Sequence, residues 1–300
     1  VPKWNPMNVC SYHLQEAGAT PTQEIAYALA TAIGVLDAVR ESGQVSDDRL
    51  PEVVASISFF VNAGIRFVEE TAKMRAFTQM WDRITEERYG VSDPKARRFR
   101  YGVQVNSLGL TEAQPENNVQ RIVLEALGVT LSRNARARSL QLPAWNEALG
   151  LPRPWDQQWS LRIQQVLAQE TDLLEYDDLF EGSHVMEAPT KNLVDEAQAE
   201  LDEVLDLGGA FEAIDELKGR LVRSHTERMR RIEAGDLPVV GVNCFTGTAE
   251  SPLGGNESIM KVDPAVAAET IADVKAWREA RNQSHVDAAL GELERVARSD

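Results

Sequence analysis

Short apolar runs alternate with long helical patterns along this chain, and no other feature constrains its fold as strongly. The apolar runs predict five strands, at residues 7–10, 53–60, 101–106, 139–142 and 238–245. Amphipathic patterns follow the first four runs and predict helices at residues 21–40, 63–87, 117–131 and 157–170. Strands that alternate with long helices are joined by crossovers and form a parallel sheet. We therefore expect an α/β fold, although five strands are three fewer than a closed eight-stranded barrel needs.

The last third of the chain is expected to be helical apart from the fifth strand. Two helices are predicted at residues 192–207 and 210–234, and glycines end both of them. The stretch 251–256 is rich in Gly, Pro and Ser and is typical of a linker. Two short charged helices are predicted beyond it, at 264–281 and 284–298. We therefore expect one unit over residues 1–250, and a linker with a helical extension over residues 251–300.

Composition excludes several classes of partner. The formal net charge is −16, and clustered Lys and Arg are lacking, which argues against nucleic acid and against an acidic membrane surface. Cys10 and Cys244 both fall in apolar runs, which disfavours a disulfide framework and favours the cytoplasm. The first residues do not resemble a signal peptide, and no apolar run of about 18 residues predicts a membrane span. Because Val1 stands a few residues before a predicted strand, we expect the chain to be cut from a larger protein.

Polar side chains follow the predicted strands, where a parallel sheet would gather them at one edge. In chain order they are Tyr12, His13 and Glu16; Ser58 and Asn62; Gln104, Asn106 and Ser107; Gln141, Trp145, Asn146 and Glu147; Asn243 and Thr246. This edge would hold one imidazole and two carboxylates. No metal-ligand spacing, phosphate-binding glycine loop or nucleophile elbow accompanies them.

Structural explanations compete with functional ones for these residues. A lone histidine at a strand end is structural about as often as it is functional, and Glu16 also precedes the helix start marked by Thr20 and Pro21. Glu147 fits a solvated loop equally well. Amides inside a strand, such as Gln104, are harder to explain without a ligand. The residues alone predict a site for a neutral or carbonyl-bearing ligand and do not name it.

Five separated motifs carry a family resemblance. Residues 11–20, Ser-Tyr-His-Leu-Gln-Glu-Ala-Gly-Ala-Thr, resemble the S-G-Y-H-x-Q-E-A-G-A signature of the adenosylcobalamin-dependent acyl-CoA mutases, the methylmalonyl-CoA mutase family. Residues 58–60, 117–126, 146–152 and 241–243 resemble further motifs of that family in the same order. The resemblance covers roughly residues 4–246. Residues 5–13 and 104–118 look most like the ethylmalonyl-CoA mutase branch.

The resemblance implies a fold and an activity. The fold would be the second part of a parallel (β/α)8 barrel of the TIM type, with a helical extension leading toward a cobalamin-binding domain. The activity would be a radical 1,2-migration of the carbonyl-CoA group, with ethylmalonyl-CoA converted to methylsuccinyl-CoA. Methylmalonyl-CoA or a related branched acyl-CoA is the alternative substrate. A non-catalytic barrel subunit and a cofactor-free α/β enzyme or binding module are the alternative functions.

The resemblance also implies partners and roles for individual residues. We expect an acyl-CoA substrate, adenosylcobalamin, the missing barrel half, a cobalamin-binding domain and a dimer. No histidine here lies in the D-x-H-x-x-G motif that supplies the cobalt ligand, so we expect no metal ligand in this chain. By this resemblance His13 would be catalytic and act on the thioester carbonyl, with Tyr12 as a catalytic residue beside it. The substrate would be bound by Gln104, Ser58, Gln141 and Arg138. The cofactor would be bound by Glu16, Glu147 and Ser107. Ser56, Arg138 and Gln141 depart from the residues usual in the family.

Overall fold

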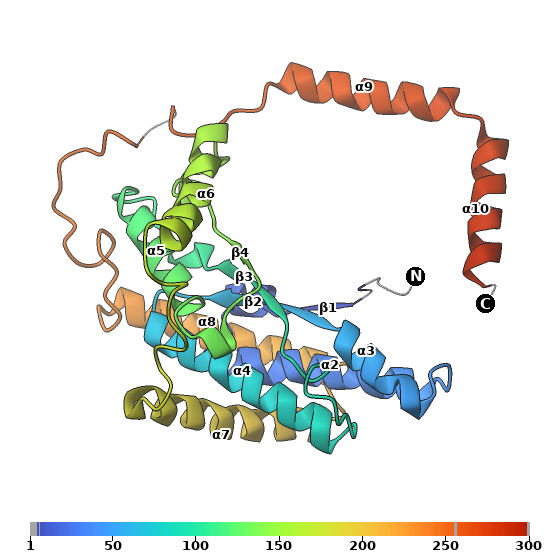
Figure 1. Cartoon of the computed structure of the whole chain (residues 1–300). Helices are drawn as coiled ribbons and strands as arrows, with labels where there is room; N and C mark the ends of the chain where they lie inside the picture. The colour runs from blue at the N-terminus through green and yellow to red at the C-terminus, as the bar shows by residue number, and fades with distance from the viewer. Residues whose placement is uncertain (1–4, 6, 255–256, 299–300) are drawn as a thin grey trace. The chain divides into compact units, whose positions relative to one another are not determined.

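The computed structural model describes residue 5 and residues 7–254 and 257–298. The chain divides into two compact units, Val1–Ile259 and Met260–Asp300, and each is described by itself. The first unit holds a four-stranded parallel sheet in the order β1-β2-β3-β4 (Figure 1). Its strands are β1 (Asn8–Cys10), β2 (Ser58–Ala63), β3 (Tyr101–Val105) and β4 (Ser139–Gln141). The predicted α/β fold with a parallel sheet is confirmed, and the closed barrel stays a prediction.

Helices connect the strands of this sheet and follow the last of them, and some of these helices cover one of its faces. They are α1 (Tyr12–Glu16), α2 (Pro21–Glu41), α3 (Leu50–Ser56), α4 (Phe67–Glu87), α5 (Asn117–Gly128), α6 (Pro154–Gln169), α7 (His184–Asp206) and α8 (Ile214–Glu233). In Figure 1, α2 and α4 lie beneath the sheet, and α7 packs against both of them. The capping box predicted at the start of α2 is present, with Thr20 and Gln23 bonded reciprocally.

The two faces of the sheet differ in character because side chains alternate along each strand. The helix-covered face carries buried apolar side chains, including Phe59, Val61, Val103 and Val105. The other face carries exposed or partly exposed residues: Asn8, Cys10, Ser58, Phe60, Gly102, Gln104, Ser139 and Gln141. Strands of a parallel sheet are usually covered on both faces. This second face, which we call the open face, is therefore the one suited to meeting a ligand or further chain.

The fifth strand is a wrong prediction. Residues 238–245 form turns with a single isolated bridge between Val240 and Cys244. The Asn243 side chain takes local backbone partners: its Oδ1 accepts from the Val239 N–H, and its Nδ2 donates to the Leu237 carbonyl. Such local bonds compete with a strand ladder. The apolar side chains that suggested a buried strand are instead largely exposed, with Phe245 80% exposed.

The boundaries of the second strand were also predicted wrongly. Residues 50–56 form the helix α3, with Pro51 in its first turn, and β2 begins only at Ser58. An apolar run does not by itself distinguish a short helix from a strand, whereas proline in the first turn favours the helix. The following helix, α4, accordingly begins at Phe67 instead of residue 63. The first of the two predicted late helices, α7, begins at His184, eight residues before the predicted start at 192.

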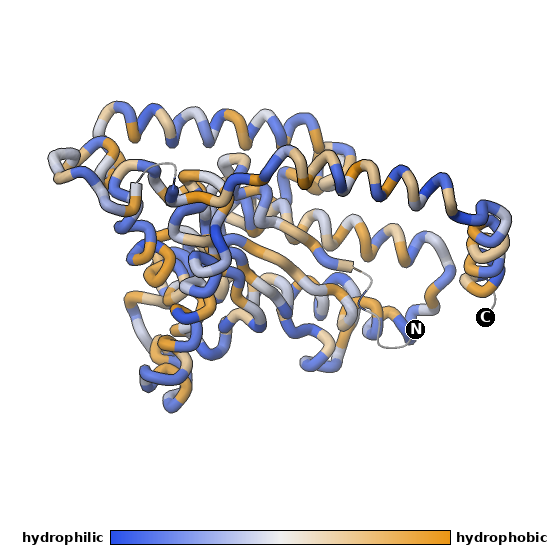
Figure 2. The backbone as a smooth tube through the Cα atoms, turned by 90° about the horizontal axis from the view of Figure 1, so that it is seen from above, coloured by the Kyte–Doolittle hydropathy of each residue, from blue (hydrophilic) through white to orange (hydrophobic). Residues whose placement is uncertain are grey.

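The second unit consists of two helices, α9 (Pro264–Ala280) and α10 (Gln283–Ala297), as predicted. Polar and apolar residues are interspersed along both of them (Figure 2). Their residues are almost all exposed. Across the described ranges, no helix is long and apolar enough to cross a membrane.

Candidate functional site

A chain of hydrogen bonds joins polar side chains at the carboxyl ends of β1 and β3. Gln104 Nε2 donates to Tyr12 Oη over 2.9 Å, and Tyr12 Oη lies 3.4 Å from Ser107 Oγ. Ser107 Oγ in turn donates to Glu16 Oε1 over 3.0 Å. Tyr12 and Glu16 lie on α1, directly after β1, whereas Ser107 begins the 3-10 turn after β3. The parallel strand order thus brings together four of the predicted site residues.

Glu147 lies close enough to these hydrogen-bonded side chains for Glu16 and Ser107 to affect its pKa, and the pKa of Tyr12 is shifted as well. Loss of hydration, together with the charge of Glu16, raises the pKa of Glu147, while a bond from Ser107 opposes the rise. Burial likewise raises the pKa of Tyr12 to about 12, so its hydroxyl stays protonated at neutral pH. In the part of the chain that the structure describes, neither Glu16 nor Glu147 pairs with a cation. We call Tyr12, Glu16, Gln104, Ser107 and Glu147 the carboxyl-end cluster.

His13 and Gln141 lie beside the carboxyl-end cluster with their side chains exposed. The His13 ring meets the Tyr12 ring edge-on, with their centroids 5.2 Å apart. No hydrogen bond to its imidazole is found among the described residues, so both ring nitrogens are available to a ligand. Gln141 stands opposite Gln104 in the register of β3 and β4, on the open face. Asn106, by contrast, has a structural role, since its Oδ1 accepts from the Leu108 N–H and caps the turn.

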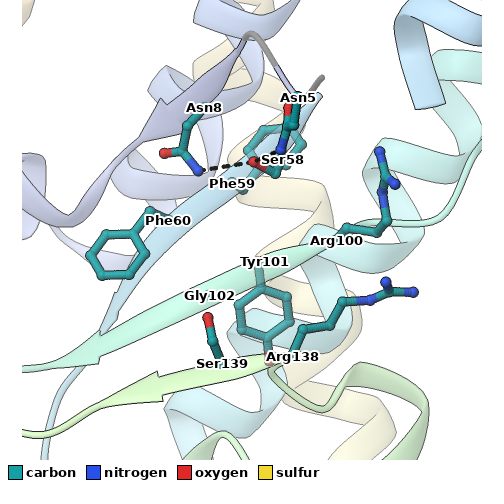
Figure 3. A pocket seen from close by; sticks show the side chains of 10 residues that line it. All are labelled: Asn5, Asn8, Ser58, Phe59, Phe60, Arg100, Tyr101, Gly102, Arg138 and Ser139. Carbon is teal, nitrogen blue, oxygen red and sulfur yellow. Dashed lines mark hydrogen bonds between the residues drawn. The ribbon is translucent and has the colours of Figure 1, made fainter. Parts of the chain in front are cut away.

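Ser58 and Arg138 lie at the opposite end of the sheet, which corrects the prediction that Ser58 follows a strand. Ser58 begins β2, and Arg138 directly precedes β4. Both line a pocket of about 270 Å³ between the amino ends of the strands (Figure 3). The other residues lining it are Asn5, Asn8, Phe59, Phe60, Arg100, Tyr101, Gly102 and Ser139. We call this the amino-end pocket.

Arg100 is a residue of the amino-end pocket that the sequence analysis missed. Burial lowers the pKa of its guanidinium, and the charge of Arg138 lowers it further. Within the described ranges neither arginine forms an ion pair, and Arg100 donates only to the Ile57 carbonyl. Two neighbouring unpaired arginines in a chain of net charge −16 favour an anionic ligand. The sequence signal was Arg100 directly before a strand, parallel to Arg138 before the next one.

A buried ion cluster was also missed. Lys73 Nζ on α4 lies 2.6 Å from Glu24 Oε2 on α2 and 2.5 Å from Glu70 Oε2. The three side chains are at most 3% exposed. Burial lowers the pKa of Lys73, but the two carboxylates more than offset this effect and raise it, which keeps the ammonium charged. No sequence signal marked Lys73, because other charged residues such as Glu69 and Arg75 stand close to it on α4. We call Glu24, Glu70 and Lys73 the buried ion cluster.

No group of three or more His, Cys, Asp or Glu side chains is arranged to hold a metal ion in the described ranges. Cys10 and Cys244 are both free thiols. The chemistry available to the site therefore comes from an imidazole, a neutral phenol, two amides and two carboxylates at one end, and from two guanidinium groups at the other.

Comparisons with known proteins identify the family. The methylmalonyl-CoA mutase family model matches residues 1–300. The chain is 61% identical to an ethylmalonyl-CoA mutase of Cereibacter sphaeroides and 58% identical to one of Methylorubrum extorquens, covering all of this chain and 46% and 44% of those proteins. It is 31% identical to the 2-hydroxyisobutanoyl-CoA mutase large subunit of Aquincola tertiaricarbonis over 99% of this chain and 52% of that protein. The chain thus spans about half the length of these relatives, and it belongs to the methylmalonyl-CoA mutase family.

Proposed function

We propose that the chain forms part of the catalytic barrel of an adenosylcobalamin-dependent acyl-CoA mutase that converts ethylmalonyl-CoA to methylsuccinyl-CoA. The observation that carries this proposal is the carboxyl-end cluster: residues of two separate family motifs, around Tyr12 and around Glu147, gather with Gln104 at one edge of a parallel sheet. The identity of about 60% to two ethylmalonyl-CoA mutases favours this substrate over methylmalonyl-CoA.

The proposed barrel requires more chain than the structure contains. Residues 1–250 would supply its second part, and the open face of the sheet would line its interior. Residues 251–300 would form the linker and helices leading toward a cobalamin-binding domain. The missing barrel half and that domain would come from the same chain or from another one, and the whole protein would be a dimer.

The two ends of the open face would bind different parts of the substrate. Arg100 and Arg138 suit the phosphates of an acyl-CoA, because guanidinium groups donate in pairs to phosphate oxygens. Ser58 beside them would contact the CoA arm. Gln104 lies four residues beyond Arg100 and Gln141 three beyond Arg138, which is roughly 10–13 Å at the usual rise per residue. The acyl group would therefore lie at the carboxyl end, beside the amides of these two glutamines.

His13 would act on the thioester carbonyl of the migrating group. An imidazole N–H that donates to this oxygen stabilises the charge that develops there during migration, which is most valuable in the transition state. The exposed ring of His13 has no competing partner among the described residues, and Tyr12 packs against its edge. Because Tyr12 is held neutral at physiological pH, its phenol lines the pocket without adding a charge.

The carboxyl-end cluster fits adenosylcobalamin through Glu16, Ser107 and Glu147. Its two carboxylates lie near each other, and no cation pairs with them among the residues that the structure describes. They are therefore available to the hydroxyl and amide donors of such a cofactor. Bound adenosylcobalamin would supply the carbon radical that starts the rearrangement. The role of these three residues would be to orient the cofactor at the mouth of the barrel and to help exclude water.

Turnover of ethylmalonyl-CoA by the full-length protein that contains this chain tests the proposal. With adenosylcobalamin present we expect methylsuccinyl-CoA, detected by mass spectrometry, and slower turnover of methylmalonyl-CoA. His13→Ala should lower kcat by about 100-fold or more, as loss of a carbonyl donor does elsewhere, whereas the exposed His184→Ala should leave it unchanged. No turnover of any acyl-CoA by a cofactor-loaded protein would favour the non-catalytic subunit, and turnover without cobalamin would favour the cofactor-free enzyme.

A further inference from the structure

The short helix α1 carries Tyr12, His13 and Glu16. It is too short to be stable without contacts to other parts of the fold. It has five residues, and helices this short are unstable unless other parts of the fold support them. The side chain of its N-cap residue, Ser11, makes no capping bond to the helix. The buried Ser11 hydroxyl instead donates to Glu24 Oε1 on α2, over 2.9 Å. The first end of α1 is thus attached to the buried ion cluster.

The last turn of α1 is attached to the same cluster. Lys73 Nζ donates to Gln15 Oε1 over 3.3 Å, while also bonding Glu24 Oε2. Gln15 faces inward from α1, so this bond leaves Tyr12 and Glu16 free for the carboxyl-end cluster. Two consecutive anchors, one at each end of a five-residue helix, fix both its position and its rotation.

The buried ion cluster also fixes the strand against which α1 packs. The pairing of β1 with β2 ends at Cys10 opposite Phe60, so Asn62 has no partner residue on β1. Glu24 Oε1 accepts from the Asn62 N–H over 3.0 Å, and Lys73 Nζ donates to the Asn62 carbonyl over 2.8 Å. Two charged side chains therefore take the place of a missing strand residue, directly beneath α1.

Stability is a weak explanation for such a cluster. Removing three charges from water is costly, and well-packed apolar residues of similar size are often at least as stabilising. Oriented bonds to Ser11, Gln15 and Asn62 are what apolar residues would not supply. We propose that Glu24 and Lys73 are positioning residues, which hold α1 so that Tyr12, His13 and Glu16 meet the substrate and the cofactor. The reaction that they serve is the proposed function, whereas the attachment of α1 is independent of it.

A variant that cuts the two anchors and leaves the buried ion cluster intact tests this inference. Ser11→Ala combined with Gln15→Met removes both bonds without exposing or unpairing a charge, which Glu24→Ala or Lys73→Ala would do. Thr85→Val is the matched control, because its buried hydroxyl bonds only to carbonyls of its own helix, at Trp81 and Asp82. Both proteins are made at full length, and hydrogen exchange and steady-state kinetics are measured on each.

We expect amide exchange in α1 to rise about tenfold in the double variant and to stay unchanged there in Thr85→Val. The kcat for the acyl-CoA should fall at least about tenfold, since misplacement of catalytic groups by about 1 Å is this costly. KM should change by less than about twofold, because the amino-end pocket is untouched. A loss of activity through general destabilisation would instead appear in both variants.

Two results would overturn the inference: unchanged exchange in α1, or faster exchange with unchanged kcat. A wild-type protein with no mutase activity would refute the proposed function by itself. Faster exchange of α1 in the double variant of that inactive protein would still support the attachment through Ser11 and Gln15. The two failures are therefore distinguishable.

Discussion

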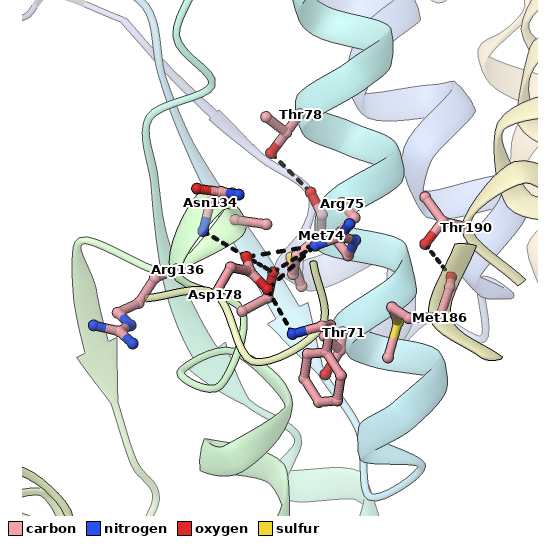
Figure 4. A network of polar contacts seen from close by, with 12 residues as sticks. Thr71, Met74, Arg75, Thr78, Asn134, Arg136, Asp178, Met186 and Thr190 are labelled. Carbon is pink, nitrogen blue, oxygen red and sulfur yellow. Dashed lines mark hydrogen bonds and ion pairs between the residues drawn. The ribbon is translucent and has the colours of Figure 1, made fainter. Parts of the chain in front are cut away.

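Helix α4 contributes a cation to each of two groups of buried charges, and the carboxylates of the two groups are stabilised to different degrees. Lys73 belongs to the buried ion cluster beneath the carboxyl-end cluster. Two residues later, Arg75 binds Asp178, which also accepts from the Asn134 N–H over 2.9 Å (Figure 4). Asp178 accepts from Ser132 Oγ as well, over 2.7 Å. We call Arg75, Ser132, Asn134 and Asp178 the Asp178 network.

The difference lies in how fully each carboxylate is satisfied. Burial alone would raise the pKa of Asp178, but the backbone and hydroxyl donors around it, with Arg75, hold this pKa below its usual range. For Glu70 the balance is reversed, since burial and the charge of Glu24 outweigh Lys73 and raise its pKa. Nearby Glu125 is fully buried, and neither of its carboxylate oxygens has a hydrogen-bond partner in the described residues. The Asp178 network has the properties of a stabilising clamp, whereas burial disfavours the charged forms of Glu70 and Glu125.

The largest expected effect comes from removing the cation of the buried ion cluster. Lys73→Met would leave Glu24 and Glu70 buried without a counterion, and the free energy of unfolding should fall by about 3–5 kcal/mol. Urea unfolding at pH 7 measures this loss. Lys191→Met, which removes an exposed lysine paired with Asp195, should cost less than about 1 kcal/mol. Equal losses in the two variants would show that Lys73 is not a buried counterion.

A smaller loss, with a distinctive pH dependence, is expected in the Asp178 network. Asp178→Asn should lower the free energy of unfolding by about 2–3 kcal/mol at pH 7, because charge-assisted bonds weaken. The folded pKa of Asp178 is depressed, so its contribution is present above the unfolded value of about 3.9 and is lost as pH falls through the folded pKa. Unfolding measured from pH 7 down to pH 3 should show the difference from wild type shrinking below about pH 4.

The matched control for Asp178 is the second carboxylate on the same arginine. Glu187 lies 2.7 Å from Arg75 Nη2, and its side chain is half exposed. Glu187→Gln should therefore change the free energy of unfolding by less than about 1 kcal/mol at every pH. A difference for Asp178→Asn that stays constant with pH would contradict the description of the Asp178 network as a charge-dependent clamp.

The sequence was sufficient to predict the carboxyl-end cluster but not the buried charges. The carboxyl-end cluster was predictable because parallel strands end at one edge, so Tyr12, Glu16, Gln104 and Ser107 could be placed from strand order alone. Ser58 was misplaced because β2 begins at this residue, and an error of half a strand moves a side chain to the opposite end of the sheet. Arg138 shares that end because it precedes β4.

The buried charges were not predictable for a different reason. Lys73 and Arg75 are two residues apart in the same helical pattern, and nothing in that pattern tells which charge loses its water. Burial of Lys73 depends on Glu24, which is 49 residues away. The missed turn at residues 238–245 has the same origin, since the choice between strand and turn depends on whether a neighbouring strand edge is available.

The smallest expected effect on the free energy of unfolding is a gain instead of a loss, and it comes from substitution of Glu125. Burial, with the charge of Glu70, raises the pKa of Glu125 well above its usual value, so ionisation opposes folding. The protonated Glu125 carboxyl therefore contributes to the free energy of unfolding in full below its unfolded pKa of about 4.3. This contribution is lost as pH rises through the folded pKa. Glu125→Gln should match wild type near pH 4 and exceed its free energy of unfolding by on the order of 1 kcal/mol at pH 8.

The exposed Glu112→Gln serves as the control for Glu125 and should show no such divergence in urea unfolding between pH 4 and pH 8. A Glu125→Gln protein that loses stability as pH rises would mean that its carboxylate is satisfied when charged, as that of Asp178 is. A gain in stability accompanied by slower turnover would instead show that the unpaired Glu125 carboxylate is kept at the expense of stability. Stability and kcat measured on the same variant therefore decide whether the carboxylates near Lys73 serve the fold or the site.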